Sequence, residues 1–138
     1  MPPKIQVLLA EDFKPYRAIV ASLLAGNPDL RVVCEASDGI EAVEKAKQLQ
    51  PNLILMDIGL PKLNGLEAAR RIHELVPSSK IVFLTQETDI DVVREALSLG
   101  AAGYIIKQRA GTDLIAGLAA IFEGRQFVSD GFARNSSQ

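Results

Sequence analysis

The chain has 138 residues, of which 48% are hydrophobic and 23% are charged. This balance indicates one globular domain and excludes a chain that is disordered along most of its length. The formal net charge of -2, without a dense run of Lys or Arg, argues against direct binding of nucleic acid. No apolar run approaches the roughly 20 residues of a membrane-spanning helix, so no membrane partner is expected. Cys34 is the only cysteine and cannot form an internal disulfide, so we expect a reducing, cytoplasmic location.

Two patterns alternate along the chain. Short apolar, β-branched runs predict strands, and apolar residues at helical spacing predict helices. The expected elements, strand and helix in turn, are Ile5–Ala10, Pro15–Ala25, Arg31–Ala36, Asp38–Gln50, Leu53–Met56, Asn64–Val76, Lys80–Leu84, Asp89–Leu99, Gly103–Ile106 and Thr112–Phe122. Such alternation predicts an α/β fold, with a parallel sheet covered by helices on both faces.

The ends of the expected helices carry typical stop and start residues. Candidate N-caps are Asp38, Asn64, Asp89 and Thr112. Candidate C-terminal stops are Gly26, Gly100 and Gly124.

Chemically active side chains collect at the carboxyl ends of the expected strands. The first strand is followed by Glu11 and Asp12, the third by Asp57, the fourth by Thr85 and the fifth by Lys107. Ligands of open α/β sheets bind beyond the carboxyl ends of the strands. We therefore expect three carboxylates, one hydroxyl and one ammonium group to meet at one edge of the sheet.

This combination of groups suits phosphoryl transfer. Carboxylates that lie this close repel each other unless a cation joins them, and oxygen ligands favour Mg²⁺ or Mn²⁺. Lys107 adds a second positive charge that would keep Asp57 ionised. An ionised Asp beside a metal ion can attack a phosphoryl group and form an aspartyl phosphate. The Thr85 hydroxyl could donate a hydrogen bond to the transferred group.

Each of these residues also has a simpler interpretation. Glu11 and Asp12 could cap the first helix, and Asp57 could be a turn residue before Gly59. Thr85 and Lys107 are unremarkable when each is taken alone. Matched chemistry at four strand ends favours a functional site over these separate interpretations.

Several segments together resemble the receiver domain of two-component response regulators. They are Val7–Asp12, Leu53–Pro61, Asn64–Gly65, Leu84–Thr85 and Gly103–Lys107, and the resemblance extends from about Lys4 to Gly124. The stretch Asp57–Ala68 is most similar to the NarL/FixJ-type subgroup, whose output is a helix-turn-helix DNA-binding domain. Gly124–Ser129 resembles the segment that leads into that output domain.

The resemblance implies a flavodoxin-like, five-stranded parallel sheet in the order 2-1-3-4-5 with five helices. It implies Mg²⁺ held by Asp12, Asp57 and the Gly59 carbonyl, with Glu11 acting through water. It implies transfer of a phosphoryl group from a histidine kinase or phosphotransfer protein to Asp57. Thr85 and Tyr104 would then form a switch pair, in which Thr85 moves to the phosphoryl group and Tyr104 turns inward behind it. The implied role is regulatory, not enzymatic.

The resemblance also sets expectations for organisation and partners. Residues 1–124 would form the receiver domain, and residues 125–138 a tail or the start of a linker. The residues after Gly111 mostly complete the last helix and leave no room for a helix-turn-helix domain. We therefore expect either a receiver taken from a longer transcription regulator or a single-domain protein that acts on other proteins. A homodimer formed on phosphorylation is a further expectation.

Two residues depart from the common pattern of receivers. Gln86 follows Thr85 where a small residue is common, and it could shield an acyl phosphate from water or slow the entry of a phosphodonor. Gln108 follows Lys107 where many receivers have proline, which leaves the geometry of the Lys107–Gln108 peptide bond open.

Three other functions share the fold or part of this chemistry. A haloacid-dehalogenase phosphatase needs a second Asp two residues after its nucleophile, where this chain has Gly59. A flavodoxin-like electron carrier needs a first loop that cradles phosphate, and Glu11 and Asp12 would repel one. A degenerate receiver would bind partners without phosphorylation. The intact acidic pair, Asp57, Thr85 and Lys107 argue against this function.

Overall fold

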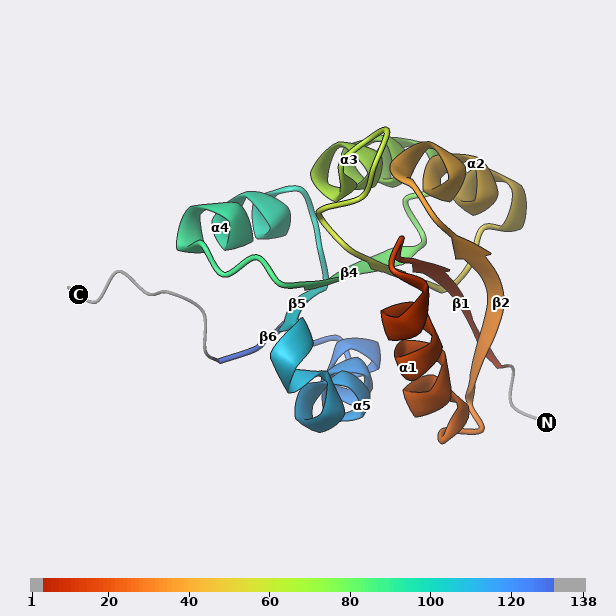
Figure 1. Cartoon of the computed structure of the whole chain (residues 1–138), viewed down its shortest axis with the longest axis vertical. Coiled ribbons are helices and arrows are strands. Elements are labelled where there is room, and N and C mark those ends of the chain that lie inside the picture. Colours follow the sequence, from red (N-terminus) through yellow and green to blue (C-terminus); the bar gives the residue numbers. More distant parts are fainter. Residues whose placement is uncertain (1–3, 131–138) are drawn as a thin grey trace.

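The computed structural model describes residues 4–130, which form one parallel sheet covered by helices (Figure 1). The strand order is β2-β1-β3-β4-β5-β6. In chain order the elements are β1 (Ile5–Ala10), α1 (Lys14–Ala25), β2 (Leu30–Ala36), α2 (Gly39–Leu49), β3 (Leu53–Met56), α3 (Gly65–Leu75), β4 (Lys80–Thr85), α4 (Ile90–Ser98), β5 (Gly103–Ile106), a 3₁₀ turn (Lys107–Arg109), α5 (Ala110–Phe122) and β6 (Phe127–Val128). The flavodoxin-like α/β fold with five α-helices is confirmed in this part of the chain.

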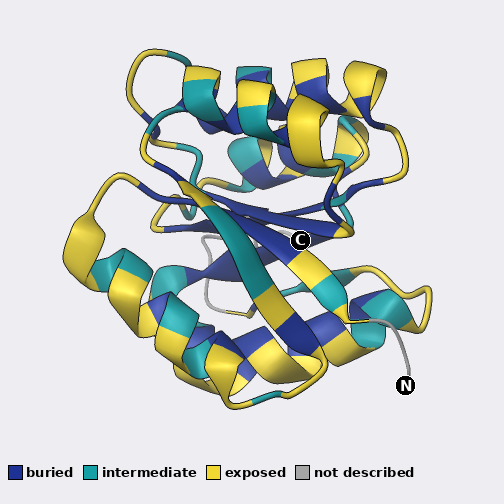
Figure 2. Ribbon diagram, turned by 90° about the vertical axis from the view of Figure 1, so that its right-hand side faces the viewer, coloured by how far each residue is buried: buried dark blue, intermediate teal, exposed yellow. Residues whose placement is uncertain are grey.

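The sheet lies between two layers of helices. Helices α1 and α5 cover one face, and α2, α3 and α4 cover the other (Figure 1). Side chains of β3 alternate between the two layers: Ile54 and Met56 pack with α2, α3 and α4, while Leu53 and Leu55 pack with α1 and α5. Figure 2 shows the buried central strands between helices whose outer faces are exposed, while the edge strand β2 is partly exposed. Within residues 4–130, no helix combines the length and the apolar character that crossing a bilayer requires.

The prediction of five strands is wrong, because Phe127–Val128 adds a sixth. Strand β6 pairs in parallel with β5, with Phe127 opposite Gly103 and Val128 opposite Tyr104. A Cβ atom at Gly117 would lie 2.8 Å from the Phe127 ring, so the glycine makes room for that ring on α5. Only two residues pair, which is too short a run for an apolar pattern to show. Two residues of the stretch expected to be a tail therefore belong to the sheet.

Three of the four predicted N-caps are confirmed. The side chains of Asp38, Asn64 and Asp89 accept hydrogen bonds from backbone amides in the first turns of α2, α3 and α4. The prediction for Thr112 is wrong: α5 begins at Ala110, directly after the 3₁₀ turn that follows β5. Lys107 therefore stands at the junction between a strand and a helical turn, where its backbone is held on both sides.

Candidate functional site

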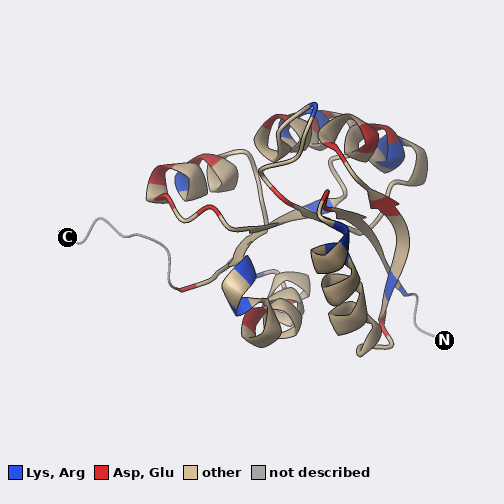
Figure 3. Cartoon of the chain, in the orientation of Figure 1, with Lys and Arg blue, Asp and Glu red and all other residues tan. Residues whose placement is uncertain are grey.

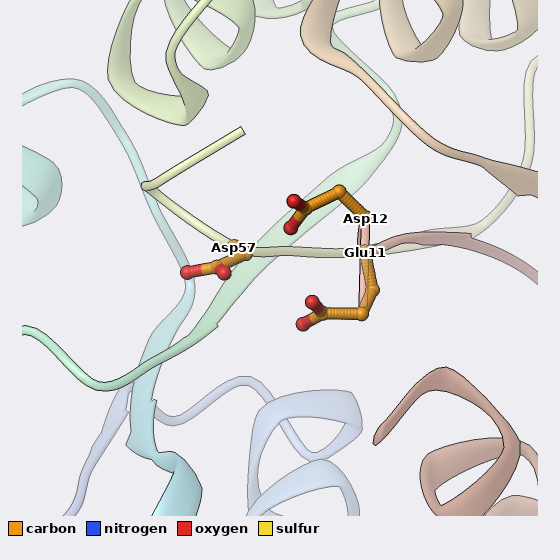
Figure 4. Close-up of side chains that lie close together, drawn as sticks. All are labelled: Glu11, Asp12 and Asp57. Carbon is orange, nitrogen blue, oxygen red and sulfur yellow. The ribbon is translucent and has the colours of Figure 1, made fainter. Parts of the chain in front are cut away.

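The register of the central strands brings three carboxylates together. Ala10 of β1 pairs with Met56 of β3, so the residues that follow each strand meet at the same edge of the sheet. The Asp57 amide donates to the Ala10 carbonyl at 3.1 Å, which keeps the two chains paired to this point. One carboxylate oxygen each from Glu11, Asp12 and Asp57 lies within 4.8 Å of the other two (Figure 4). The predicted acidic cluster therefore forms.

Lys107 reaches this cluster from the end of β5. Its ammonium lies 2.6 Å from Oε1 of Glu11 and 3.0 Å from Oδ2 of Asp57. These three side chains are 10%, 4% and 12% exposed, so solvent screens their charges only partly. Burial disfavours the charged ammonium, but the hydrogen bonds and charges of Glu11 and Asp57 outweigh it, and the pKa of Lys107 is raised. The lysine is thus held as a cation between two carboxylates.

Backbone amides orient the carboxylates further. The Phe13 amide donates to Oε2 of Glu11 at 3.0 Å, and the Gly59 amide donates to Oδ1 of Asp57 at 3.3 Å. Phe13, and neither Glu11 nor Asp12, is the N-cap residue of α1, and no side chain caps that helix. The role of the Gly59 carbonyl as a metal ligand stays a prediction.

Gly65 allows the loop after Asp57 to fold back closely. A Cβ atom at this position would lie 2.1 Å from the Asp57 carbonyl oxygen. The Gly65 amide also donates to the Ile58 carbonyl at 2.7 Å. Any side chain here would therefore displace the backbone that carries Asp57.

Thr85 and Tyr104 both contact the backbone of Glu87. Thr85 ends β4 and is buried, and its Oγ1 accepts a hydrogen bond from the Glu87 amide at 3.3 Å. The Tyr104 ring is fully buried, and its hydroxyl donates to the Glu87 carbonyl at 2.8 Å. Burial raises the pKa of Tyr104, and nearby acidic charges add to the effect. The two residues expected to switch thus share one loop segment.

An open pocket of about 450 Å³ gives access to the acidic cluster. Its lining residues are Glu11, Asp12, Phe13, Tyr16, Asp57, Gln86, Lys107 and Gln108. Gln86 therefore lies at the pocket, as the sequence predicted. The Lys107–Gln108 peptide bond, whose geometry the sequence left open, is trans. Helix α1 has no charged residue after Arg17, and Asp113 is the only charged residue of α5 (Figure 3). Most of the charge around the pocket therefore comes from residues at strand ends.

Tyr16 is a further contact of Lys107 that nothing in the sequence pattern indicated. The Lys107 ammonium lies 4.7 Å from the centroid of the Tyr16 ring. The Tyr16 hydroxyl donates to the Lys107 carbonyl at 3.2 Å. Burial raises the pKa of Tyr16, with the Lys107 charge opposing the shift and the charges of Glu11 and Asp57 adding to it. A tyrosine in an amphipathic helix is usually a packing residue, so only the folded structure reveals this contact.

Comparison with known proteins identifies the family. A model described as the response regulator receiver domain matches residues 7–119. The transcriptional regulatory protein DegU of Brevibacillus brevis is 34% identical over 125 residues, which are 91% of this chain and 53% of that protein. The nitrate/nitrite response regulator protein NarL of Escherichia coli (strain K12) is 36% identical over 124 residues, which are 90% of this chain and 57% of that protein. The chain spans about half the length of the curated relatives it matches.

A solved structure agrees with these sequence relationships. A two-component response regulator of the LuxR family from Aurantimonas sp. SI85-9A1 matches with a TM-score of 0.87 at 28% identity, covering 92% of this chain and 91% of that one. The phosphatase and electron-carrier alternatives do not account for these relationships. The chain belongs to the receiver domains of two-component response regulators, in the NarL/FixJ-type subgroup.

Proposed function

We propose that the chain is a phosphorylation-controlled switch in which Asp57 accepts a phosphoryl group from a histidine kinase or phosphotransfer protein. The observation that carries the proposal is that the Lys107 ammonium contacts both Asp57 and Glu11, and that all three residues line one pocket. A carboxylate that is oriented beside a fixed cation is suited to attack a phosphorus atom.

The donor set fits a divalent cation. Carboxylate oxygens of Glu11, Asp12 and Asp57 lie within 4.8 Å of one another, and such hard oxygen donors suit Mg²⁺ or Mn²⁺. Asp12, Asp57 and the Gly59 carbonyl would hold the ion directly, and Glu11 would act through water. When bound, the ion supplies positive charge that offsets the charge of the phosphoryl group.

The chain's own residues perform the remaining steps. An oxygen of Asp57 attacks the phosphorus in line as the bond from phosphorus to the donor breaks, and the aspartyl phosphate forms. The Lys107 ammonium then pairs with a phosphoryl oxygen in place of the Asp57 carboxylate. The Thr85 hydroxyl, whose oxygen accepts from the Glu87 amide, turns to donate to another phosphoryl oxygen. Because Tyr104 bonds to the same Glu87 backbone, this movement reaches the output face.

The output is control of a partner or of a DNA-binding domain, and through it of transcription. DegU is named as a transcriptional regulatory protein and NarL as a response regulator, and about half of each protein matches this chain. The face formed by α4, β5 and α5 would contact the output partner or a second copy on phosphorylation. The chain would not bind nucleic acid directly, and it would act in the cytoplasm.

Intact-protein mass spectrometry tests the proposal. The protein is incubated with acetyl phosphate, with and without Mg²⁺, alongside Asp57→Asn and Asp29→Asn. Asp29 is an exposed residue in the turn before β2 and serves as the matched control. We expect one added phosphoryl group in wild type and Asp29→Asn only with Mg²⁺, and none in Asp57→Asn. No labelling under any condition would favour a degenerate receiver that acts without phosphorylation.

A further inference from the structure

Tyr16 contacts Lys107 at two points that lie at opposite ends of the lysine. The ring faces the ammonium at 4.7 Å from its centroid, within the range of a cation–π interaction. The hydroxyl donates to the backbone carbonyl at 3.2 Å. Tyr16 comes from α1 and Lys107 from the end of β5, so the contacts join elements 91 residues apart in the chain.

Lys107 needs such support because of where it stands. Its side chain is a flexible four-carbon stem that ends in a compact point charge. The residue opens the 3₁₀ turn Lys107–Arg109, whose N-terminus has no side-chain cap. Within the turn, the Lys107 carbonyl accepts a hydrogen bond from the Ala110 amide. The Tyr16 hydroxyl adds a contact from outside the turn.

The ammonium itself is fixed by three partners of two kinds. Glu11 and Asp57 attract it as anions, and the Tyr16 ring attracts it through the negative charge of its face. Phosphoryl transfer replaces the Asp57 carboxylate by an acyl phosphate, whereas Glu11 and the Tyr16 ring are unchanged by the reaction. Tyr16 is thus the uncharged partner that, together with Glu11, can hold the ammonium in place before and after transfer.

We propose that Tyr16 is a positioning residue for phosphoryl transfer, which keeps the Lys107 ammonium at the reacting carboxylate through its ring and hydroxyl. This inference rests on the proposed phosphorylation of Asp57. Small displacements of a charged group in a reaction site reduce the rate strongly. Loss of the Tyr16 ring is therefore expected to slow phosphorylation without removing any group that contacts the phosphorus.

The test compares Tyr16→Leu, which loses the ring and the hydroxyl, with Tyr16→Phe, which keeps the ring. Ile19→Leu, at an exposed position on the same helix, is the control. Two quantities are measured: the rate constant of phosphorylation by acetyl phosphate with saturating Mg²⁺, and the ¹H shift of the Lys107 ε-methylene group. Protons next to an aromatic face are shifted upfield by the ring current.

We expect Tyr16→Leu to lose the upfield shift of the Lys107 ε-methylene protons. Its phosphorylation should be slower than that of wild type by a factor of about ten or more. Tyr16→Phe should keep the shift and restore most of the rate, and Ile19→Leu should match wild type. The inference is overturned if Tyr16→Leu reacts at the wild-type rate, or if its rate falls while the Lys107 shift is unchanged. If wild type itself is not phosphorylated, the proposed function fails, and the shift still reports whether Tyr16 holds Lys107.

Discussion

Lys107 and Asp57 meet at 3.0 Å although their strands are not neighbours in the sheet. Strand β4 lies between β3 and β5, so the lysine extends past the end of β4, where Thr85 stands. The same ammonium reaches Glu11 at the end of β1, one strand further away. A long flexible stem is required to span this distance, which explains why lysine suits the position. The Lys107 ammonium would compete with a bound metal ion for the same carboxylates.

Two substitutions should therefore change Mg²⁺ affinity in opposite directions. Asp12→Ala removes a direct carboxylate ligand and should weaken binding strongly. Lys107→Met removes a like charge beside the ion and should strengthen binding by about tenfold, equivalent to ~1.4 kcal/mol. Isothermal titration calorimetry measures both, with Asp29→Ala as the control. Unchanged affinity in Asp12→Ala would refute its assignment as a ligand.

Gln86 should lengthen the lifetime of the phosphorylated state. It is exposed and lines the pocket, next to the hydroxyl expected to contact the phosphoryl group. Hydrolysis requires a water molecule in line behind the phosphorus, and the bulk of Gln86 should exclude it. Gln86→Ala should lose phosphate several-fold faster under saturating Mg²⁺, while Gln48→Ala on α2 should not differ from wild type. Slower loss would mean that the amide orients the attacking water instead.

Phosphorylation should alter the face formed by α4, β5 and α5. Thr85 and Tyr104 both bond to the backbone of Glu87, so a movement of the threonine changes the environment of the tyrosine. The phosphoryl group shifts the equilibrium between two conformations of the protein only if one of them binds it better than the other. Amide NMR shifts should change on that face as well as around the site, with Asp57→Asn under the same conditions as the control. Changes confined to the site would contradict this coupling.

Ser129 should stabilise the fold by fastening the end of β6. Its buried hydroxyl donates to Oδ2 of Asp113 at 2.7 Å and accepts from the Ile106 amide at 3.2 Å. Ser129→Ala should lower the free energy of unfolding by about 1–2 kcal/mol, because a buried amide and a buried carboxylate each lose a partner. Ser98→Ala, at an exposed site, should change it by less than about 0.5 kcal/mol. Equal denaturant midpoints for Ser129→Ala and wild type would count against this role.

The sequence predicted the central part of the fold well for a physical reason. Strands such as Leu53–Met56 are covered on both faces, so every residue is apolar and the run stands out. The candidate catalytic residues Asp57 and Lys107 each follow such a strand directly, so both could be placed at one edge of the sheet from the ends of the expected strands. The acidic cluster of Glu11, Asp12 and Asp57 then followed from parallel pairing.

Features that depend on distant contacts could not be predicted in this way. Strand β6 has two residues and is held by the Ser129 hydroxyl and by the space that Gly117 leaves for Phe127. Helix α5 begins before Thr112 because the 3₁₀ turn after Lys107 leads directly into it. The Tyr16 contact joins residues on different elements, so no pattern along the chain points to it.

Chemical trapping of the acyl phosphate tests the central claim most directly. Borohydride reduces an aspartyl phosphate to homoserine, which marks the modified residue permanently. The protein is treated with acetyl phosphate and Mg²⁺, reduced, digested and mapped by peptide mass spectrometry, with Asp57→Asn treated in parallel. The account predicts homoserine at position 57 alone, and none in Asp57→Asn. Homoserine at Asp12, or reduced peptides at equal levels in wild type and Asp57→Asn, would contradict it.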